Sequence, residues 1–394
     1  MLSSQQKLFM QIIEVLDEKH KKDFLRLPIK FYKDDPNWIR PLDKDVEAVF
    51  DPKQNKFFRD GECARFLLAD GTGNTIGRIA VFTSGKIFKK ESQPTGGIGF
   101  FECINDQQAA NMLLDHCKNW LLERGMEAMD GPVNFGERES WWGLIVKGFT
   151  PVPYKMNYNP PYYQALFETY GFQTYFEQWC YSLVVQNRLD EKFYERHSEI
   201  KKNPDYKAVH LRKKNLEKFA EDFRIVYNKA WAKRGEGKEL EAKQVQLFFS
   251  KMKPVIDEKV IWFVYYKNEP VAMWVNLPDI NQIFGKFNGR FGLIEKLRFV
   301  WLLRKRISDK FIGLVFGVAP EHQGKGVDSY IIVEGANVIQ SQHLYKDYEM
   351  QWIGDFNPKM VTIAENLGTQ KSRILKTYRY LFDRSKPFER HRML

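Results

Sequence analysis

The sequence predicts an α/β protein of layered α+β type, in which two tandem domains each contain a mixed, twisted sheet flanked by helices. An apolar run at 311–319 precedes the glycine turn Gln323–Gly326, and a helical pattern follows the turn directly. Short apolar strands and amphipathic helices recur in similar order in both halves of the chain. The segments Asn159–Gly171 and Asn357–Gly368 both begin at Asn and end at Gly, which is typical of an internal repeat.

Length and composition agree with two globular domains. The chain has 394 residues, of which 43% are hydrophobic, enough for two apolar cores. Its formal charge is +11, from 61 basic and 50 acidic residues. Such an excess fits an anionic ligand, an anionic membrane surface or nucleic acid. Because the bases are interspersed with acids and no known nucleic-acid motif occurs, we do not expect a nucleic-acid partner.

The cysteines and the N-terminal segment indicate a cytoplasmic protein. Cys63, Cys103, Cys117 and Cys180 show neither CxxC spacing nor metal-ligand spacing with histidines, so we expect reduced, mostly buried thiols and no metal. The first 22 residues carry acids and lack a cleavage-like tail, unlike a signal peptide. No apolar run approaches the roughly 18–20 residues of a membrane span, so any membrane contact is expected to be peripheral.

In the first predicted domain, residues 1–188, hydrophobic periodicity places the elements in order. Helices are predicted at 5–16, 18–32 and 107–124 and after Asn159-Pro160-Pro161, and strands at 63–69, 75–82, 98–104 and 174–185. The turn Asp70–Asn74 between two alternating runs predicts a β-hairpin. Residues 189–205 are charged and lack apolar periodicity, so we interpret them as a linker or a surface helix.

The second predicted domain, residues 206–394, repeats this order. Strands are predicted at 206–211, 260–266, 271–277, 348–353 and 372–382, in addition to the run before the glycine turn; helices at 216–231, 241–253 and 358–367. Residues 280–306 have no counterpart in the first half and are predicted to be a helical insertion.

Several motifs resemble those of the GCN5-related N-acetyltransferase (GNAT) superfamily, whose acyl-CoA loop reads Q/R-x-x-G-x-G/A. Gln323 and Gly326 match this loop, and Asp328 replaces the usual small residue. Further motifs resemble a tandem-domain subfamily of about this length: GFFE at 99–102, GPVNF at 131–135, YNPPYY at 158–163, PDIN at 278–281, PEHQGKGVD at 320–328 and KTYRY at 376–380. They occur in both halves, so the resemblance covers nearly the whole chain and implies two tandem GNAT-like domains.

The resemblance implies acetyl-CoA or a longer acyl-CoA as co-substrate. A glycine turn before a helix presents backbone N–H groups that suit a diphosphate. The positions implied to bind the cofactor are Gly317, Val318, Gln323, Gly324, Lys325, Gly326, Val327, Asp328, Ser329 and Asn357. The corresponding loop of the first half, 103–108, contains no glycine, so we expect that domain to be degenerate and to have lost CoA binding.

Direct acyl transfer to an amine requires a base and a proton source for the leaving thiolate. Asp279 and Glu349 are the candidate bases; the alternatives are a turn or cap residue for Asp279 and a solvated strand position for Glu349. The superfamily's frequent Tyr acid would fall at Ala364, so it is absent here. Tyr378, Tyr330 or a water remain as candidates.

Other side chains have two interpretations each. His322 either touches phosphate or lies at the surface, and Trp231 either faces the pantetheine channel or belongs to the helix core. Tyr162, Tyr163 and Trp141-Trp142 either line an acceptor pocket or pack in the core. The stretch 292–306 combines an apolar stripe with Arg298, Arg304, Lys305 and Arg306. It is either a basic amphipathic helix for an anionic membrane or a helix docked on the second domain.

These expectations favour an acyl-CoA-dependent N-acyltransferase acting on a primary amine bound between or beside the domains. The chain also resembles, more loosely, bacterial ceramide synthases, which implies a lipid long-chain base as one class of acceptor. The alternative is a non-catalytic acyl-CoA-binding or regulatory protein, because the Tyr acid is missing. The sequence leaves monomer and dimer open.

Overall fold

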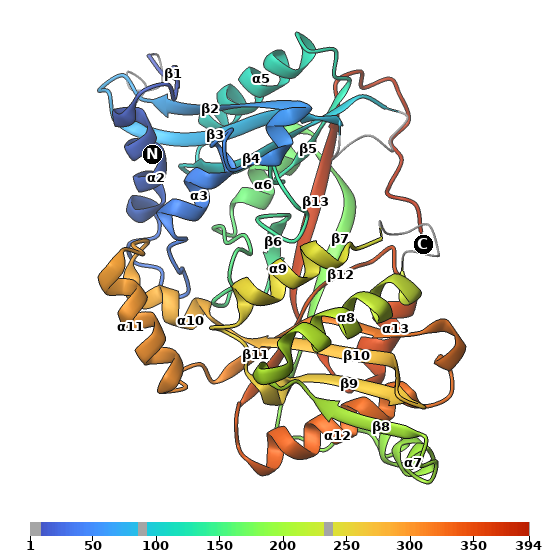
Figure 1. Cartoon of the computed structure of the whole chain (residues 1–394). Helices are drawn as coiled ribbons and strands as arrows, with labels where there is room; N and C mark the ends of the chain where they lie inside the picture. The colour runs from blue at the N-terminus through green and yellow to red at the C-terminus, as the bar shows by residue number, and fades with distance from the viewer. Residues whose placement is uncertain (1–8, 86–92, 232–238, 394) are drawn as a thin grey trace.

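The computed structural model describes residues 9–85, 93–231 and 239–393 (Figure 1). Within these residues, 13 strands form one mixed sheet that is flanked by helices. The strands are β1 (Gln11–Glu14), β2 (Gly61–Ala69), β3 (Thr75–Ser84), β4 (Thr95–Cys103), β5 (Ala128–Gly131), β6 (Leu144–Lys147), β7 (Gln173–Val184), β8 (Tyr206–His210), β9 (Ile261–Tyr266), β10 (Glu269–Pro278), β11 (Lys310–Val318), β12 (Asp347–Gly354) and β13 (Gln370–Leu381). The predicted α/β class is therefore confirmed.

The helices cover both faces of this sheet (Figure 1). They are α2 (Glu18–Phe31), α3 (Asp43–Val49), α5 (Gln107–Leu122), α6 (Tyr163–Tyr170), α7 (Glu191–Lys201), α8 (Leu216–Ala230), α9 (Ala242–Met252), α10 (Asn281–Phe284), α11 (Leu293–Arg304), α12 (Val327–Ser341) and α13 (Pro358–Asn366). In the described parts of the chain, no helix is long and apolar enough to cross a membrane. Nor do three or more His, Cys, Asp or Glu side chains gather there to hold a metal ion.

The strand order shows that the two halves exchange their last strands. The order is β1-β2-β3-β4-β5-β13-β7-β12-β11-β10-β9-β8, with β6 pairing β13. The final strand of the chain, β13, lies between β5 and β7 of the first half, and β7 pairs with β12 of the second half. Figure 1 shows β13 running beside β7 through the middle of the molecule. The predicted domain limits at 188 and 206 remain predictions, because the sheet continues across them.

Each half also contains one parallel strand pair, β4 with β5 and β11 with β12. Each pair is the junction between an antiparallel meander and the exchanged strands. Separate apolar cores lie under α5 in the first half and under α8 and α12 in the second. This arrangement agrees with the predicted repeat.

Some predicted elements are wrong or incomplete. Residues 5–16 were predicted to be helical, but residues 11–14 form β1, which pairs with β2; residues 5–8 lie outside the described residues. The sequence QIIE has only two central apolar residues, too few to distinguish a helix from a short strand. The short elements α3, β5 and β6 were not predicted. The charged segment 189–205 contains α7, which packs on α12, so a surface helix is the correct interpretation.

Candidate active site

The strands β11 and β12 separate in the second half and leave a gap. Their parallel pairing ends at Gly313 and Met350, whereas β11 continues to Val318 and β12 to Gly354. Gly313 is required at this point, because a Cβ there would lie 2.2 Å from the Tyr348 hydroxyl oxygen. Beyond Gly313, the edge of β11 that faces β12 has no strand partner among the described residues. A strand edge of this kind can accept an extended ligand with amide groups.

A cavity of about 300 Å³ lies at the open end of this gap. Its lining residues are Ala230, Trp231, Phe316, Gly317, Val318, His322, Gln323, Gly324, Asp328, Asn357, Lys359, Met360 and Ile363. Six predicted cofactor-binding residues are among them: Gly317, Val318, Gln323, Gly324, Asp328 and Asn357. The other four, Lys325, Gly326, Val327 and Ser329, form the rest of the turn and the first turn of α12. The structure thus brings the predicted set together around one cavity.

The turn before α12 presents unpaired backbone donors. Gly324 and Gly326 have φ angles of +73° and +88°, which glycine adopts without steric penalty. Gln323 donates from Nε2 to the carbonyl oxygen of Val318 at 2.8 Å and closes the turn onto β11. No side chain caps α12, and the backbone N–H groups from Gly324 to Ser329 have no backbone acceptor within the described chain. The positive end of a 15-residue helix is therefore available to an anion.

The equivalent gap of the first half is partly filled by the chain itself. The carboxylate of Asp106 caps α5 by accepting from the Ala109 N–H at 3.1 Å, so an acid already occupies this anion position. The backbone N–H of Cys103 donates to the Tyr163 hydroxyl at 2.8 Å, and the Val133 N–H donates to the Ile98 carbonyl at 2.7 Å. These contacts supply the physical reason for expecting only one anion site.

Three aromatic residues, Trp231, Phe316 and His322, line the second-half cavity. Trp231 at the end of α8 packs over Gly317, where an added Cβ would come within 2.4 Å of the indole ring. Trp231 therefore lines the cavity, and its contact with pantetheine stays a prediction. His322 is buried rather than at the surface, and one ring nitrogen lies 2.8 Å from the Tyr206 hydroxyl. Burial lowers the pKa of His322, and Lys325 lowers it further, so the ring is neutral near pH 7.

Four charged side chains gather where β10 ends beside β11. They are Asp279, Lys310, Glu349 and Arg373. The Asp279 N–H donates to the Lys310 carbonyl at 2.9 Å, and Asp279 Oδ1 accepts from the Asn281 N–H at 3.0 Å. Three residues of strand, about 10 Å, separate Lys310 from Gly313 where the gap opens. The cluster therefore lies near the closed end of the gap.

Asp279 has the titration behaviour of a general base. It is almost fully buried, and burial raises its pKa to about 7, against the opposing effects of Lys310 and the Asn281 N–H. A carboxyl group with a pKa close to the working pH is well suited to accept a proton. Its bond to the Asn281 N–H also matches the alternative interpretation as a turn residue. The structure therefore shows the turn contact of Asp279, while its role as a base stays a prediction.

Glu349 is held by two cations. It bonds to Arg373, and its Oε2 lies 3.0 Å from Lys310 Nζ. Glu349 and Arg373 are 3% and 1% exposed, so the prediction of a solvated strand position for Glu349 is wrong. Arg373 also donates to Thr150 Oγ1 at 3.0 Å and to the Pro151 carbonyl at 3.2 Å. Neither Lys310 nor Arg373 was singled out from the sequence, because the pairing joins strands far apart in the chain.

Replacing Arg373 with Met is expected to destabilise the protein by about 3 kcal/mol, because it leaves the Glu349 carboxylate buried with Lys310 alone. Urea unfolding would measure the loss. The double variant Arg373→Met/Glu349→Leu should regain much of the stability, since it removes the buried carboxylate as well and leaves only the partly exposed Lys310. An equal loss of unfolding free energy in the single and double variants would show that the loss comes from a packing defect and not from the unpaired Glu349 carboxylate.

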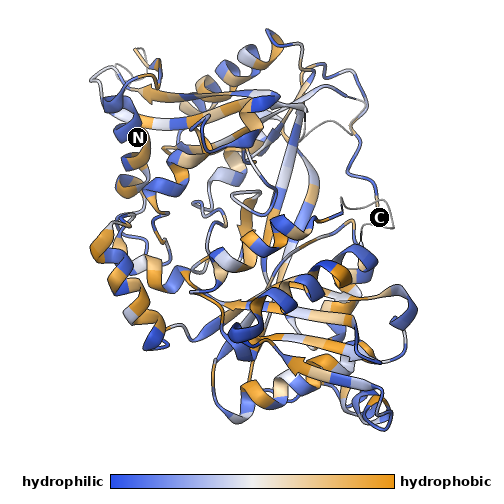
Figure 2. Ribbon diagram, in the orientation of Figure 1, coloured by the Kyte–Doolittle hydropathy of each residue, from blue (hydrophilic) through white to orange (hydrophobic). Residues whose placement is uncertain are grey.

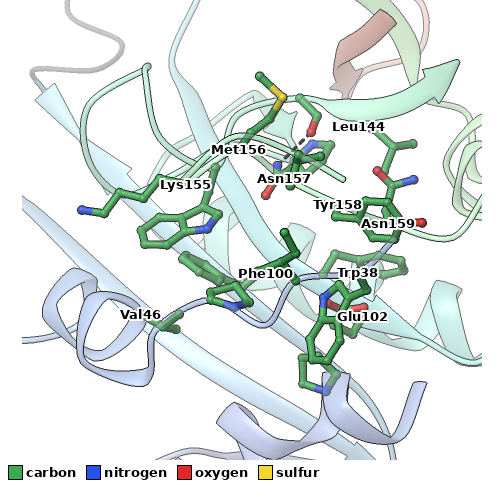
Figure 3. A pocket seen from close by; sticks show the side chains of 18 of the residues that line it. Trp38, Val46, Phe100, Glu102, Leu144, Lys155, Met156, Asn157, Tyr158 and Asn159 are labelled. Carbon is green, nitrogen blue, oxygen red and sulfur yellow. Dashed lines mark hydrogen bonds between the residues drawn. The ribbon is translucent and has the colours of Figure 1, made fainter. Parts of the chain in front are cut away.

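A second cavity, of about 70 Å³, lies in the first half beside this cluster. Figure 3 shows Trp38, Phe100, Glu102 and Tyr158 among the residues around it. The Glu102 carboxylate accepts from the hydroxyls of Tyr32 and Tyr163, both at 2.8 Å, and from Arg78. Burial raises the pKa of Glu102. Parts of the motifs at 99–102, 131–135 and 158–163 meet at this cavity, which the sequence alone did not place.

Two contacts connect this cavity to the charged cluster. Asn281, next but one to Asp279, lines the cavity and donates from Nδ2 to the Val152 carbonyl at 2.7 Å. Met156 also lines it, and its sulfur lies 3.5 Å from Arg373. Trp141 and Tyr163 belong to the lining and are also buried members of apolar core clusters, so they pack in the core, and an acceptor-binding role stays a prediction. The loop around 150–159 therefore separates an aromatic cavity from a buried acid with a raised pKa.

Tyr378 is not brought to this site. It lies on the part of β13 that pairs with β5, packs with Phe167 in the first-half core, and donates its hydroxyl to Glu168 at 2.8 Å. Tyr378 therefore lies away from the site, because the part of β13 that carries it is inserted into the sheet of the first half. Ala364, the position of the absent Tyr, is fully buried. Tyr330 lies on α12 and stacks against His197.

Known proteins resemble this chain at low sequence identity. No family model matches it. It is 28% identical over 385 residues to a bacterial ceramide synthase of Caulobacter vibrioides, covering 94% of this chain and 96% of that protein. It is 24% identical over 373 residues to protein YghO of Escherichia coli, covering 92% and 93%. A tandem GNAT protein from the clavulanic acid biosynthesis pathway superposes with a TM-score of 0.52 at 9% identity, over 97% of this chain and all of that one. The chain thus has the GNAT fold. It is a distant homologue of the bacterial ceramide synthase and of YghO.

Proposed function

We propose that this GNAT-fold protein is an acyl-CoA-dependent N-acyltransferase whose acceptor is a primary amine of the long-chain base class. The observation that carries the proposal is the gap between β11 and β12, which opens onto the uncapped N-terminus of α12. The unpaired N–H groups from Gly324 to Ser329 would hold the diphosphate of CoA. The free edge of β11, from Leu314 to Val318, would hydrogen-bond the amide groups of the pantetheine arm.

Asp279 is the proposed base. The ammonium of the acceptor loses two protons as the new C–N bond forms and the C–S bond breaks. One proton goes to Asp279, directly or through a water, and the other ends on the thiol of CoA. Glu349 is ion-paired with Arg373 and Lys310, so its role would be to keep these strands in register rather than to take a proton.

The aromatic cavity of the first half is the proposed site for the amine-bearing end of the acceptor, because its volume of about 70 Å³ is too small for a whole long chain. Its walls are mostly aromatic and aliphatic, and Asn281 connects it to the base. This lining suits a hydrophobic amine better than a strongly polar one. The homology to a bacterial ceramide synthase supports a long-chain base as the amine.

Release of free thiol from acyl-CoA tests the function. We expect thiol release with a long-chain base such as sphinganine and a long acyl-CoA, together with an amide product detected by mass spectrometry. Short polar amines offered at the same concentration serve as the matched comparison. Turnover on polar amines alone would support N-acyl transfer but reject a long-chain base as the acceptor.

A non-catalytic acyl-CoA-binding protein is the second candidate, favoured by the buried Ala364 at the position of the missing Tyr acid. The same assay distinguishes the two. Tight binding of acyl-CoA without thiol release on any amine would support this candidate and reject the transferase.

Calorimetric titration with CoA should give about one bound molecule per chain. The N-terminus of α12 has no side-chain cap and is available to the CoA diphosphate. In the first half, the carboxylate of Asp106 already caps α5 and would repel a diphosphate there. A stoichiometry near two would show that the first half also binds CoA and would contradict the role assigned to the Asp106 cap.

A further inference from the structure

Among the described residues, the helix α11 is attached to the rest of the protein through one of its faces. Phe299 and Leu302 are buried and belong to a small apolar cluster with Leu42 and residues of the α10 segment, including Ile283 and Phe284. The Phe284 and Phe299 rings stack with centroids 5.1 Å apart. The Gly292 N–H donates to Glu295 Oε2 at 2.8 Å, which caps the start of the helix. These contacts hold α11 on the edge of the molecule (Figure 1).

The outer face of α11 is apolar and exposed. The exposed fractions of Leu293, Ile294, Leu297 and Trp301 are 80%, 71%, 75% and 58%, and Val300 is 41% exposed. At 3.6 residues per turn, Leu293, Leu297, Val300 and Trp301 form one stripe opposite Phe299 and Leu302. Figure 2 shows hydrophobic and hydrophilic stretches side by side along α11, at the left edge of the molecule. Isolated exposed apolar residues are ordinary, but five on a 12-residue helix form a patch.

Basic side chains border this apolar stripe. Lys296 lies on one side of it and Arg298 and Lys305 on the other, while Arg304 lies within it near the end of the helix. All four are exposed. Glu295 is the single acid on α11 and is engaged in the cap. The face therefore has an apolar centre and a positive margin, the charge pattern of a helix that rests in a lipid interface.

We infer that the exposed face of α11 docks the protein onto an anionic membrane surface. Leu293, Ile294, Leu297 and Trp301 would enter the boundary between headgroups and acyl chains, and the four cations would meet anionic headgroups. The inference goes beyond the proposed function and does not depend on it, because it rests on α11 alone. It would place the α10 segment, from which Asn281 reaches the acceptor cavity, next to the lipid.

A second copy of the chain is the competing occupant of this face. In a two-fold dimer the same surface meets itself, so the cations bordering one stripe would approach those of the other. Like charges brought together in this way oppose association. An anionic bilayer satisfies both the apolar stripe and its positive margin, which is why it is the favoured occupant.

Sedimentation with lipid vesicles tests the docking surface. We expect the full-length protein to bind vesicles of phosphatidylcholine with about one third phosphatidylglycerol, and to bind pure phosphatidylcholine at least about tenfold more weakly. The double variant Leu297→Glu/Trp301→Glu should lose at least about tenfold in the partition coefficient for the mixed vesicles, because it removes two exposed apolar groups that would enter the bilayer and adds negative charge.

The matched control is Leu247→Glu/Phe248→Glu on α9, where two apolar side chains are also exposed but lie on a different helix. This variant should bind mixed vesicles as the unchanged protein does. Circular dichroism and thermal unfolding of both variants establish that each is folded. Equal sedimentation of the α11 variant and the unchanged protein would overturn the inference, as would an absence of binding to mixed vesicles. A dimer that the α11 variant converts to monomer would assign the face to a second copy instead.

Discussion

Replacing Asp279 with Asn is expected to reduce kcat/KM by about 10²–10⁴-fold, because Asn cannot accept the proton of the ammonium. The expectation follows from burial, which raises the pKa of Asp279 to about 7 and keeps a proton acceptor available near neutral pH. In the unchanged enzyme, kcat/KM should therefore fall as the pH drops below about 7. Thiol release measured from pH 5.5 to 9 tests both points. Activity of the Asn variant within a few-fold of the original would remove Asp279 from the mechanism.

The same substitution should leave the fold intact, which separates a chemical role from a structural one. Asn can still accept the Asn281 N–H bond that Asp279 accepts at 3.0 Å. The Asp279 carboxyl titrates near 3.8 when unfolded and near 7 when folded, so the native state holds its proton longer and stability is lost as pH rises through this window. The charge therefore costs up to about 4 kcal/mol above pH 7. The Tm of the Asn variant relative to the original should rise between pH 5 and pH 8.

Replacing Gly326 with Asp is expected to weaken CoA binding on the order of 100-fold, because a carboxylate at the start of α12 repels the diphosphate. The design copies the first half, where Asp106 occupies the equivalent position before α5. Calorimetric titration with CoA would measure the change. Gly326→Asn is the matched control, since Asn has the same shape without the charge and both side chains tolerate the positive φ of +88° better than other residues.

The Asn control also accounts for crowding near the turn. A Cβ at Gly326 would lie 3.3 Å from the Cβ of Arg196 on α7, so both variants require a small local shift. Asn should therefore weaken binding by less than about tenfold. If Asp and Asn weaken CoA binding equally, the loss comes from backbone strain, and the anion site does not lie at this helix end.

The sequence predicted the fold well because the fold depends on local patterns. Strand alternation, helix periodicity and the glycine turn are each contained in stretches of 10 to 30 residues. The predicted binding residues around the α12 turn are adjacent in the chain, so one motif was sufficient to bring them together. Their functional role stays a prediction that the CoA titrations address.

The acid–base cluster and the strand exchange could not be predicted in this way. Glu349 is balanced by Arg373 from β13 and Lys310 from β11, and these partners become neighbours only when the sheet is assembled. The position of Tyr378 depends on the same assembly, because a strand of the second half inserts beside β5 of the first. Periodicity shows that a segment is a strand, but it does not show which strand will pair with it.

The exchanged strands have a consequence for the order in which the molecule can form. During synthesis the N-terminal half leaves the ribosome while β13 has not yet been translated, so β5 lacks its neighbour and part of its sheet edge is open. An open edge is a site for pairing with the wrong chain. The first half reaches its final form only when residues 370–381 insert between β5 and β7, which links completion of both halves to a single late event. Separately expressed halves would each lack a strand that the other half carries.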